Sequence, residues 1–492
     1  MISPRESSLP GLTIPRRRTL LGINSPLLLV DRLATAATRP VEGASGAIFR
    51  ILFGLLGLAA VVRFFAYGWI DDLYIEPAYH FTYVGFAWVK PWPAWGLYLH
   101  FAGLGVLCLG ITLGLAYRLS MVLFFLGFTY IELIDQTNYL NHYYLVSLLS
   151  FLMIFMPLHR KWSVDAWRKP GSSGGLVPVG CLWVLRGMFG LVYLYAGIAK
   201  LNPDWLFLAP PLRIWLHQYS YLPVVGGLVM EAWPAYVLSW VGAGFDLTIG
   251  GWLLWGKSRP LASLAVVGFH AATGLLFQIG IFPWLMMAGT LIFFSPNWPQ
   301  RLLQRLGGLP MLGRSPSSGL PKPSAPATGP ANRPVTGPPG WLQRCAVVGI
   351  LLFTVVQIII PLRHLAYPGN VRWNEEGYRF SWRVLLNEKA GYTLFRVREP
   401  ASNRAWLVDP GEYLSPVQTE RMSLQPDMIL ATSQIIAQDF RERGYQEVEV
   451  RADAFVSMNG RPARRLIDPE VNLASQSPGI GPKAWILPAG GR

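Results

Sequence analysis

The chain has 492 residues, of which 52% are hydrophobic and only 14% are charged. Soluble domains carry about 25% charged residues, so this composition excludes an ordinary soluble protein and predicts an integral membrane protein. The net charge of +15 does not indicate nucleic-acid binding, because the basic residues gather in short segments between apolar runs, as in the cytoplasmic loops of membrane proteins. We therefore expect membrane lipid as a partner and no nucleic acid.

Apolar runs long enough to cross a membrane recur along the chain. A transmembrane helix needs about 20 apolar residues, and we expect about nine such helices in an α-helical integral membrane bundle. The runs cover residues 47–67, 95–116, 119–135, 143–158, 178–201, 236–255, 261–278, 282–295 and 345–362.

Composition divides the chain into segments with different expected environments. Proline, glycine and serine mark flexible linkers. The predicted segments are a disordered cytoplasmic N-terminal segment (1–45), the transmembrane bundle (46–300), a Pro/Gly/Ser-rich cytoplasmic linker (301–343), a last transmembrane helix (344–362), an extracytoplasmic β-rich domain (363–475) and a tail (476–492).

The orientation follows from the lysines and arginines, which favour cytoplasmic loops. Arg16–Arg18 precede the first run and Arg118 lies between the second and third, whereas the alternate loops hold almost no basic residue. Nine helices with a cytoplasmic N-terminus place the C-terminal domain outside the cytoplasm. The basic, Pro-rich composition indicates a bacterial protein, so we expect the bacterial inner membrane.

The sequence of the C-terminal region predicts a small domain with strands and one helix. Residues 392–397, 405–408 and 448–457 alternate as strands do. Residues 427–443 predict an amphipathic helix that ends before glycine. Asn459-Gly460 suits a tight β-hairpin turn.

A lysine ends the fifth apolar run, where Asn202-Pro203-Asp204-Trp205 follows Lys200 and predicts a sharp helix end with Trp205 as an interfacial anchor. One interpretation is snorkelling, in which the stem lies along lipid and the ammonium reaches water. The other is an uncharged amine, partly removed from water, that serves as a base or nucleophile.

Two further polar groups belong to the same side of the membrane in this topology. Asn141 and His142 begin the fourth run, either as an N-cap and a packing residue or as hydrogen-bonding groups aimed at a ligand oxygen beside Lys200. His270 lies within the seventh run, as a satisfied core histidine or as part of that site.

Other polar and aromatic residues leave alternatives open. Arg50 and Arg63 lie in or near the first run and need partners, which Asp246 could supply for one of them. The aromatic residues after the last run form either a membrane-proximal belt or the wall of a ligand site. No zinc, phosphate-loop or Ser-His-Asp motif is apparent, and we expect no metal.

Several ordered motifs resemble the vitamin K-dependent gamma-carboxylases and their bacterial relatives with an HTTM domain. The resemblance spans roughly residues 45–305 and 343–475. The motifs are Asn141-His142-Tyr143-Tyr144, Trp162-Ser163-Val164-Asp165, Ala196-Gly197-Ile198-Ala199-Lys200-Leu201 with Asp204-Trp205, Phe277-Gln278-Ile279-Gly280-Ile281-Phe282, Ser295-Pro296-Asn297-Trp298-Pro299, the spacing of His364, Trp373, Tyr378, Ser381 and Trp382, and Arg465-Leu466-Ile467-Asp468-Pro469.

The resemblance implies an activity and roles for these residues. The activity is oxygenation of vitamin K hydroquinone, a menaquinol-type prenylated quinone, to the 2,3-epoxide with O2, coupled to carboxylation of peptide glutamate by CO2. A γ-CH of glutamate is too weak an acid for any side-chain base, but the hydroquinone hydroxyl suits a lysine. The implied roles are catalysis (Lys200, His142), quinone binding (Asn141, His142, His270, Phe277, Tyr378) and binding of a glutamate-containing peptide or protein (His364, Trp373, Tyr378, Trp382).

The resemblance leaves two alternatives. The first outer loop and the C-terminal domain contain no cysteine, so a disulfide between them is impossible, and the chain ends sooner than animal members. One alternative is a hydroquinone epoxidase or oxygenase without protein carboxylation. The other is a non-catalytic HTTM membrane protein that binds lipid or peptide.

Overall fold

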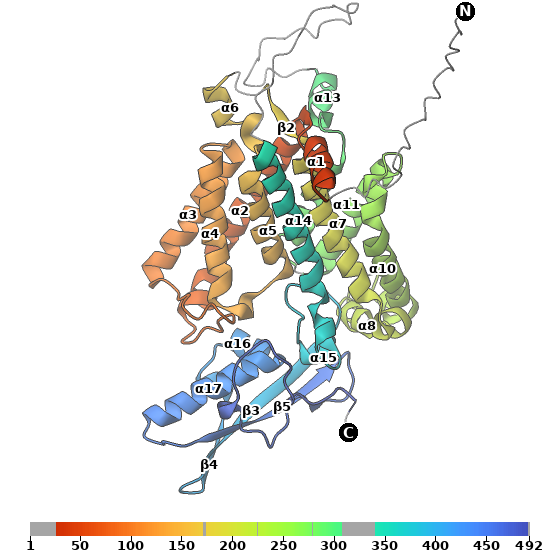
Figure 1. The fold of residues 1–492 in the computed structure, drawn as a ribbon. Helices are drawn as coiled ribbons and strands as arrows, with labels where there is room; N and C mark the ends of the chain where they lie inside the picture. Colours follow the sequence, from red (N-terminus) through yellow and green to blue (C-terminus); the bar gives the residue numbers. More distant parts are fainter. Residues whose placement is uncertain (1–25, 171–173, 224, 278, 308–339, 491–492) are drawn as a thin grey trace, which may run out of the picture.

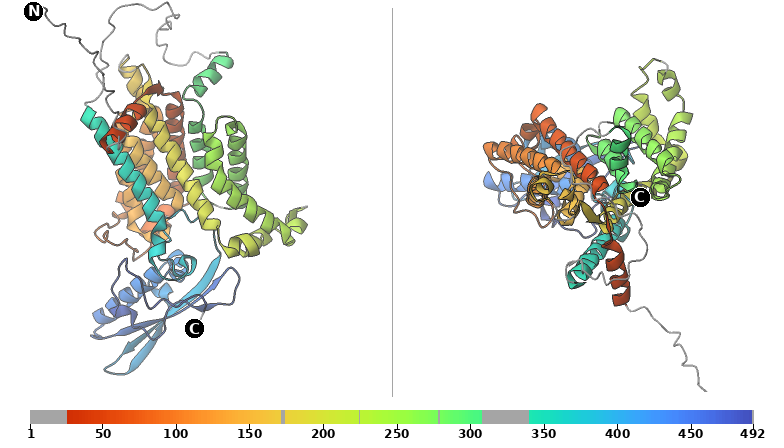
Figure 2. Two further views of the ribbon diagram at one scale, coloured as in Figure 1. Left: turned by 45° about the vertical axis from the view of Figure 1, so that its right-hand side comes forward. Right: turned by 90° about the horizontal axis from the view of Figure 1, so that it is seen from above.

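The computed structural model describes residues 26–170, 174–223, 225–277, 279–307 and 340–490. A helical bundle lies against a smaller domain that contains the main sheet (Figure 1). Seen from above, α2–α4 and α10–α11 lie on opposite sides of the bundle (Figure 2).

Each expected apolar run coincides with a helix. Two of these helices, α5 (Asn141–Phe155) and α12 (Phe282–Thr290), are short. The α-helical membrane bundle is thus confirmed, while the count of nine spans stays a prediction. The described residues contain seven helices long and apolar enough to cross a membrane, which are α2 (Ala44–Ala66), α3 (Ala94–Leu113), α4 (Tyr117–Ile134), α7 (Val179–Lys200), α10 (Trp233–Leu254), α11 (Arg259–Leu276) and α14 (Gly340–Leu362).

Glycine lets two of these helices approach closely, as small residues do in membranes. A Cβ on Gly197 of α7 would lie 2.7 Å from the backbone nitrogen of Leu247 in α10. Lys200 lies about one turn beyond Gly197, and Asp246 precedes Leu247. The close contact therefore brings the end of α7 against the middle of α10.

The N-terminal segment differs from the expectation. Residues 26–42 are not disordered, because they form helix α1 (Pro26–Ala37) and strand β1 (Pro40–Glu42), which pairs with β2 (Leu176–Pro178). Arg344 of α14 also binds Asp31 of α1 with its Nε 2.6 Å from Oδ1. Residues 1–25 and most of the expected linker (308–339) lie outside the described residues.

The C-terminal domain is built on a four-stranded antiparallel sheet with the order β4-β3-β5-β6. The expected strands, helix and Asn459-Gly460 turn are present, and both turn residues have positive φ. The elements are β3 (Lys389–Glu399), β4 (Arg404–Val408), β5 (Glu449–Met458), β6 (Arg464–Arg465), α16 (Pro416–Met422) and α17 (Pro426–Glu442).

Residues 476–490 belong to this domain, so the expected tail is wrong for them. Trp485 is buried, and Ile486 forms a bridge with Ile467. The Leu487 carbonyl accepts a 2.7 Å hydrogen bond from Trp373 Nε1. These contacts close one side of the domain core.

Shorter helices connect the main elements. They are α6 (Val164–Arg168), α8 (Pro210–His217), α9 (Val225–Met230), α13 (Trp298–Arg305), α15 (Val371–Asn374), η1 (Asp71–Ile75), η2 (Gln136–Asn138), η3 (Leu158–Arg160), η4 (Asp204–Leu208), η5 (Leu291–Phe293), η6 (Arg363–Ala366), η7 (Pro410–Glu412) and η8 (Leu473–Ser475).

The predicted orientation is testable with single cysteines placed at opposite ends of the molecule. In a cysteine-free background, Ser402→Cys in the β3–β4 loop reacts with a membrane-impermeant maleimide in intact cells. Lys169→Cys, after α6, reacts only after permeabilisation. Both positions are exposed. The reverse labelling pattern would contradict the orientation.

Candidate functional site

Lys200 is paired inside the bundle rather than exposed to water. Its Nζ lies 2.7 Å from Asp246 Oδ2 and 5.4 Å from the centre of the Trp205 ring. Lys200 is 6% exposed and Asp246 is 5% exposed. The snorkelling interpretation therefore does not hold.

The pairing bears on two points that the sequence leaves open. An uncharged amine was one interpretation of Lys200, and the structure adds a carboxylate with which that amine can share a proton. From sequence, Asp246 could pair with Arg50 or Arg63. Instead, the Arg50 guanidinium donates to the carbonyls of Ile111 and Trp162.

Arg63 lies near His142 with no carboxylate partner among the residues the structure describes. Its guanidinium lies 5.1 Å from the Trp69 ring. Gly280 has φ +60°, and a Cβ there would lie 3.3 Å from His142 Nε2 and 3.7 Å from an Arg63 terminal nitrogen. The glycine turn thus leaves room for both polar groups at the end of α5.

His142 and His270 meet around one aromatic ring. The Phe282 centroid lies 6.1 Å from that of His142 and 5.8 Å from that of His270. His270 Nε2 lies 2.9 Å from the Tyr193 hydroxyl, while its Nδ1 is buried without a hydrogen-bond partner among the described residues. His270 therefore keeps one ring nitrogen free.

Ring contacts lead from His142 toward the helix that carries Asp246. His270 lies 6.4 Å from the ring of Phe245, which precedes Asp246 on α10. The contacts thus run from α5 through α12 and α11 to α10, where Asp246 is the next residue along the chain.

Asn141 connects the bundle to the segment after the last span. Helix α5 has Leu140 as its N-cap, so Asn141 is not the cap. Its Nδ2 donates to the Arg383 carbonyl at 3.0 Å, and its Oδ1 accepts from the Tyr139 hydroxyl at 3.0 Å. Tyr144 stacks on Trp382 at 5.1 Å between centroids.

His364, Tyr378 and Arg383 form a second polar group beside this aromatic cluster. Arg383 donates to His364 Nε2 at 2.9 Å, and the Arg383 guanidinium lies 6.0 Å from the Tyr378 ring. His364 Nδ1 faces the Pro361 carbonyl at 2.9 Å. Burial raises the pKa of the Tyr378 hydroxyl, which keeps it a hydrogen-bond donor.

Two predicted site residues lie elsewhere. Trp373 is 4% exposed and packs in the core of the C-terminal domain. Phe277 packs edge-on against Trp215 of α8 at 5.5 Å. The structure does not join either of them to the Lys200 group.

Asp204 was missed as a partner for the C-terminal domain. It accepts from Arg461 Nη1 at 3.0 Å and Asn459 Nδ2 at 2.9 Å, and Arg372 Nη1 lies 3.4 Å away. The Arg461 hydrogen bond lowers the pKa of the Asp204 carboxyl. Asp204 therefore ties the segment after Lys200 to the β5–β6 hairpin.

Family models match both parts of the chain. Residues 38–298 match the HTTM domain, and residues 342–491 match the lumenal domain of vitamin K-dependent gamma-carboxylase. The chain belongs to the vitamin K-dependent gamma-carboxylase family. The lumenal match supports an extracytoplasmic C-terminal domain, and it includes the segment expected to be a tail.

No solved structure matches the chain significantly. Within the described residues, no group of three His, Cys, Asp or Glu side chains could hold a metal ion. The expectation that this carboxylase-family protein needs no metal stays a prediction.

The Asp204 contacts predict loss of stability in acid. The pKa of Asp204 is lower in the folded protein than in the unfolded chain, where it is about 3.9. Its contribution to folding stability is therefore fully present above the unfolded pKa and is lost as pH falls through the folded pKa. Asp204→Asn lowers the unfolding temperature at pH 7. Thermal unfolding of wild type and variant between pH 7 and pH 3 measures both effects. An equal drop in unfolding temperature on acidification in the two proteins would contradict this role of Asp204.

Proposed function

We propose that this protein oxygenates a vitamin K-type hydroquinone to its epoxide and couples the reaction to carboxylation of peptide glutamate, with Lys200 as the base. The observation that carries the proposal is the buried Lys200–Asp246 pair. Ring contacts lead from His142 through Phe282 and His270 to Phe245, the residue before Asp246. The family membership supports this reaction class.

The pair supplies a base only if its proton can move. A buried amine and carboxylate share protons as one unit, and removal from water favours their neutral forms. When the shared proton resides on Asp246, Lys200 presents a neutral amine at Nζ. That nitrogen then accepts the hydroxyl proton of the substrate.

The residues present suit a hydroquinone. His270 Nδ1 is a buried ring nitrogen without a partner among the described residues, and a ligand oxygen would satisfy it. Phe282 and Phe245 provide faces for a flat ring, and His142 adds a second polar group. When bound, the hydroquinone supplies, through its reaction with O2, the base strength that no side chain has.

The group around Tyr378 supports a site for glutamate on the outer side. Arg383 and the Tyr378 hydroxyl are donors suited to a carboxylate, and Asn141 connects them to α5 next to His142. Binding there would bring a glutamate side chain toward the quinone site. CO2 is then required as the carboxyl source.

A test of the base replaces Lys200. Lys200→Ala and Lys200→Arg each lower epoxide formation about 10²–10⁴-fold, because arginine keeps the charge but cannot lose its proton. The exposed Lys257→Arg serves as the control and stays active. Chromatography of reduced vitamin K after incubation with O2 measures the product. Full activity in Lys200→Arg would favour a binding role without catalysis.

Carboxylation needs its own measurement. With a glutamyl peptide and labelled CO2, we expect label in the peptide together with epoxide. Tyr378→Phe lowers CO2 incorporation about tenfold through loss of one hydrogen bond, and reduces epoxide less. Exposed Tyr392→Phe is the control. If the wild type formed epoxide but no labelled peptide, the result would support an epoxidase and contradict the proposed carboxylase activity.

A further inference from the structure

A chamber opens between α7 and α14, and α1 contributes to its wall at the end that lies away from the C-terminal domain (Figure 1). The α7–α14 chamber is lined by residues within 180–191 of α7 and 347–357 of α14, and its volume is about 270 Å³. A Cβ added to Gly187 of α7, another lining residue, would meet nothing within 4 Å beyond its own helix backbone. The space is therefore open rather than filled by side chains.

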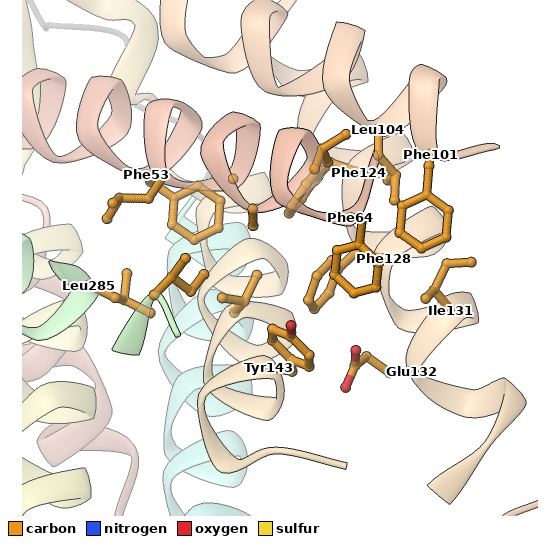
Figure 3. Close-up of a pocket in the computed structure, with 16 residues that line it drawn as sticks. Phe53, Phe64, Phe101, Leu104, Phe124, Phe128, Ile131, Glu132, Tyr143 and Leu285 are labelled. Atoms are coloured by element: carbon orange, nitrogen blue, oxygen red, sulfur yellow. The ribbon is translucent and has the colours of Figure 1, made fainter. Parts of the chain in front are cut away.

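Volume decides which pocket of the bundle can hold a ligand. The pocket among α2–α5, lined by phenylalanines and by Glu132 (Figure 3), has free space of about 30 Å³, which suits a water molecule. The α7–α14 chamber exceeds the cavity of about 150 Å³ that holds a benzene ring and approaches the lower limit of about 300 Å³ for pockets that bury a drug-sized ligand. One ring and the start of a chain can therefore enter it.

Side-chain contacts fix α14 at both ends of the chamber. At one end, Arg344 Nε lies 2.6 Å from Asp31 Oδ1 of α1. At the other, the Tyr195 hydroxyl of α7 donates to the Ile358 carbonyl at 2.7 Å. The chamber lies between these two contacts, so it belongs to the way α14 is attached to the bundle.

Gln357 supplies a buried hydrogen-bond donor at the end near the C-terminal domain. Its side chain is 3% exposed, and its Oε1 accepts from the Tyr144 hydroxyl at 3.2 Å. Its Nε2 has no hydrogen-bond partner among the described residues. The hydroxyl of Thr354, which also lines the chamber, is already bonded to the Ile350 carbonyl at 2.8 Å. Since an unpaired polar group in apolar surroundings is costly, the Gln357 amide calls for an acceptor oxygen.

The depth of Gln357 limits what can bring that oxygen. Helix α14 has 23 residues, or about 34 Å, and the hydrocarbon layer is about 30 Å thick. Gln357 precedes Leu362, the last residue of α14, by five residues, or about 7 Å. Its amide thus lies inside the hydrocarbon layer, below the level of phospholipid head groups. The ligand is therefore a lipid whose own oxygen lies within that layer.

A prenylated quinone has this chemistry, because its ring carbonyls enter the hydrocarbon layer with the chain. We propose that the α7–α14 chamber is a holding site for the quinone, in which Gln357 Nε2 donates to a ring carbonyl and the first prenyl units lie along α7. The choice of a quinone rests on the function proposed above.

The holding site is separate from the reacting groups but close to them in the fold. The lining that the structure describes does not include Lys200, Asp246 or His142. Tyr144, which is bonded to Gln357, follows His142 by two residues on α5. A quinone in the chamber would thus lie beside the helix that carries His142, from which it can be supplied to the reaction.

Photolabelling tests the holding site without turnover. The full chain in lipid nanodiscs is irradiated with an oxidised menaquinone analogue that carries a diazirine on its first prenyl unit, and labelled residues are mapped by mass spectrometry. We expect label within 180–191 and 347–357. Gly187→Leu lowers it about tenfold or more, because the added side chain occupies the chamber. Gly349→Leu, on an exposed part of α14 outside the lining, is the control and keeps the label.

A second pair of variants tests the hydrogen bond and remains informative if Gly187→Leu does not fold. Gln357→Leu lowers the label about threefold to tenfold through loss of one donor. Tyr144→Phe removes the Tyr144–Gln357 contact but leaves the amide, and keeps the label within about threefold. Equal loss in these two variants would contradict a direct role of the Gln357 amide.

Two comparisons separate a quinone from bulk lipid and from the reaction. Excess unlabelled menaquinone displaces the label, whereas a phospholipid with a diazirine in its acyl chain labels wild type and Gly187→Leu alike. Lys200→Ala keeps the quinone label although it loses epoxide formation, so the two proposals fail independently. Quinone label that menaquinone does not displace, or phospholipid label that Gly187→Leu abolishes, would overturn the inference and assign the chamber to bulk lipid.

Discussion

The contact between Lys200 and Asp246 is the constraint on which the site depends. Either charge alone inside a membrane would be costly. Removing one partner of a buried ion pair destabilises a protein by about 3–5 kcal/mol, because the other charge is left uncompensated. The pair therefore requires α7 and α10 to lie close together. Gly197 permits this, because a side chain there would collide with Leu247. The close packing of α7 and α10 is thus required for the pairing of the Lys200 amine.

The end of α7 also sets where the C-terminal domain lies. Four residues after Lys200, Asp204 binds Arg372, Asn459 and Arg461 from that domain. Asn141 makes a comparable link from α5 to Arg383. Both polar ends of the candidate site are therefore attached to the C-terminal domain, and under the proposed function a bound peptide and a quinone would meet at that surface.

Periodicity and charge predicted most of the architecture from sequence. Apolar runs located the helices, and alternation located β3, β4 and β5, because these patterns reflect one-sided burial within a single element. The basic loops placed Lys200 and His142 at the same end. Residues 26–42 and 476–490 were missed because their order comes from partners distant in sequence, such as β2 for β1 and Ile467 for Ile486.

The site itself was predictable only in part, for the same reason. Arg50 and Arg63 were the cations considered for Asp246 from sequence, and only the close approach of α7 and α10 selects Lys200. For Trp373, the residue type alone could not distinguish a position in the domain core from one in the wall of a ligand site. Glu132 was missed, although an acid within a predicted span needs an explanation. Lys200 is paired with a carboxylate, whereas Glu132 has no cation partner among the described residues.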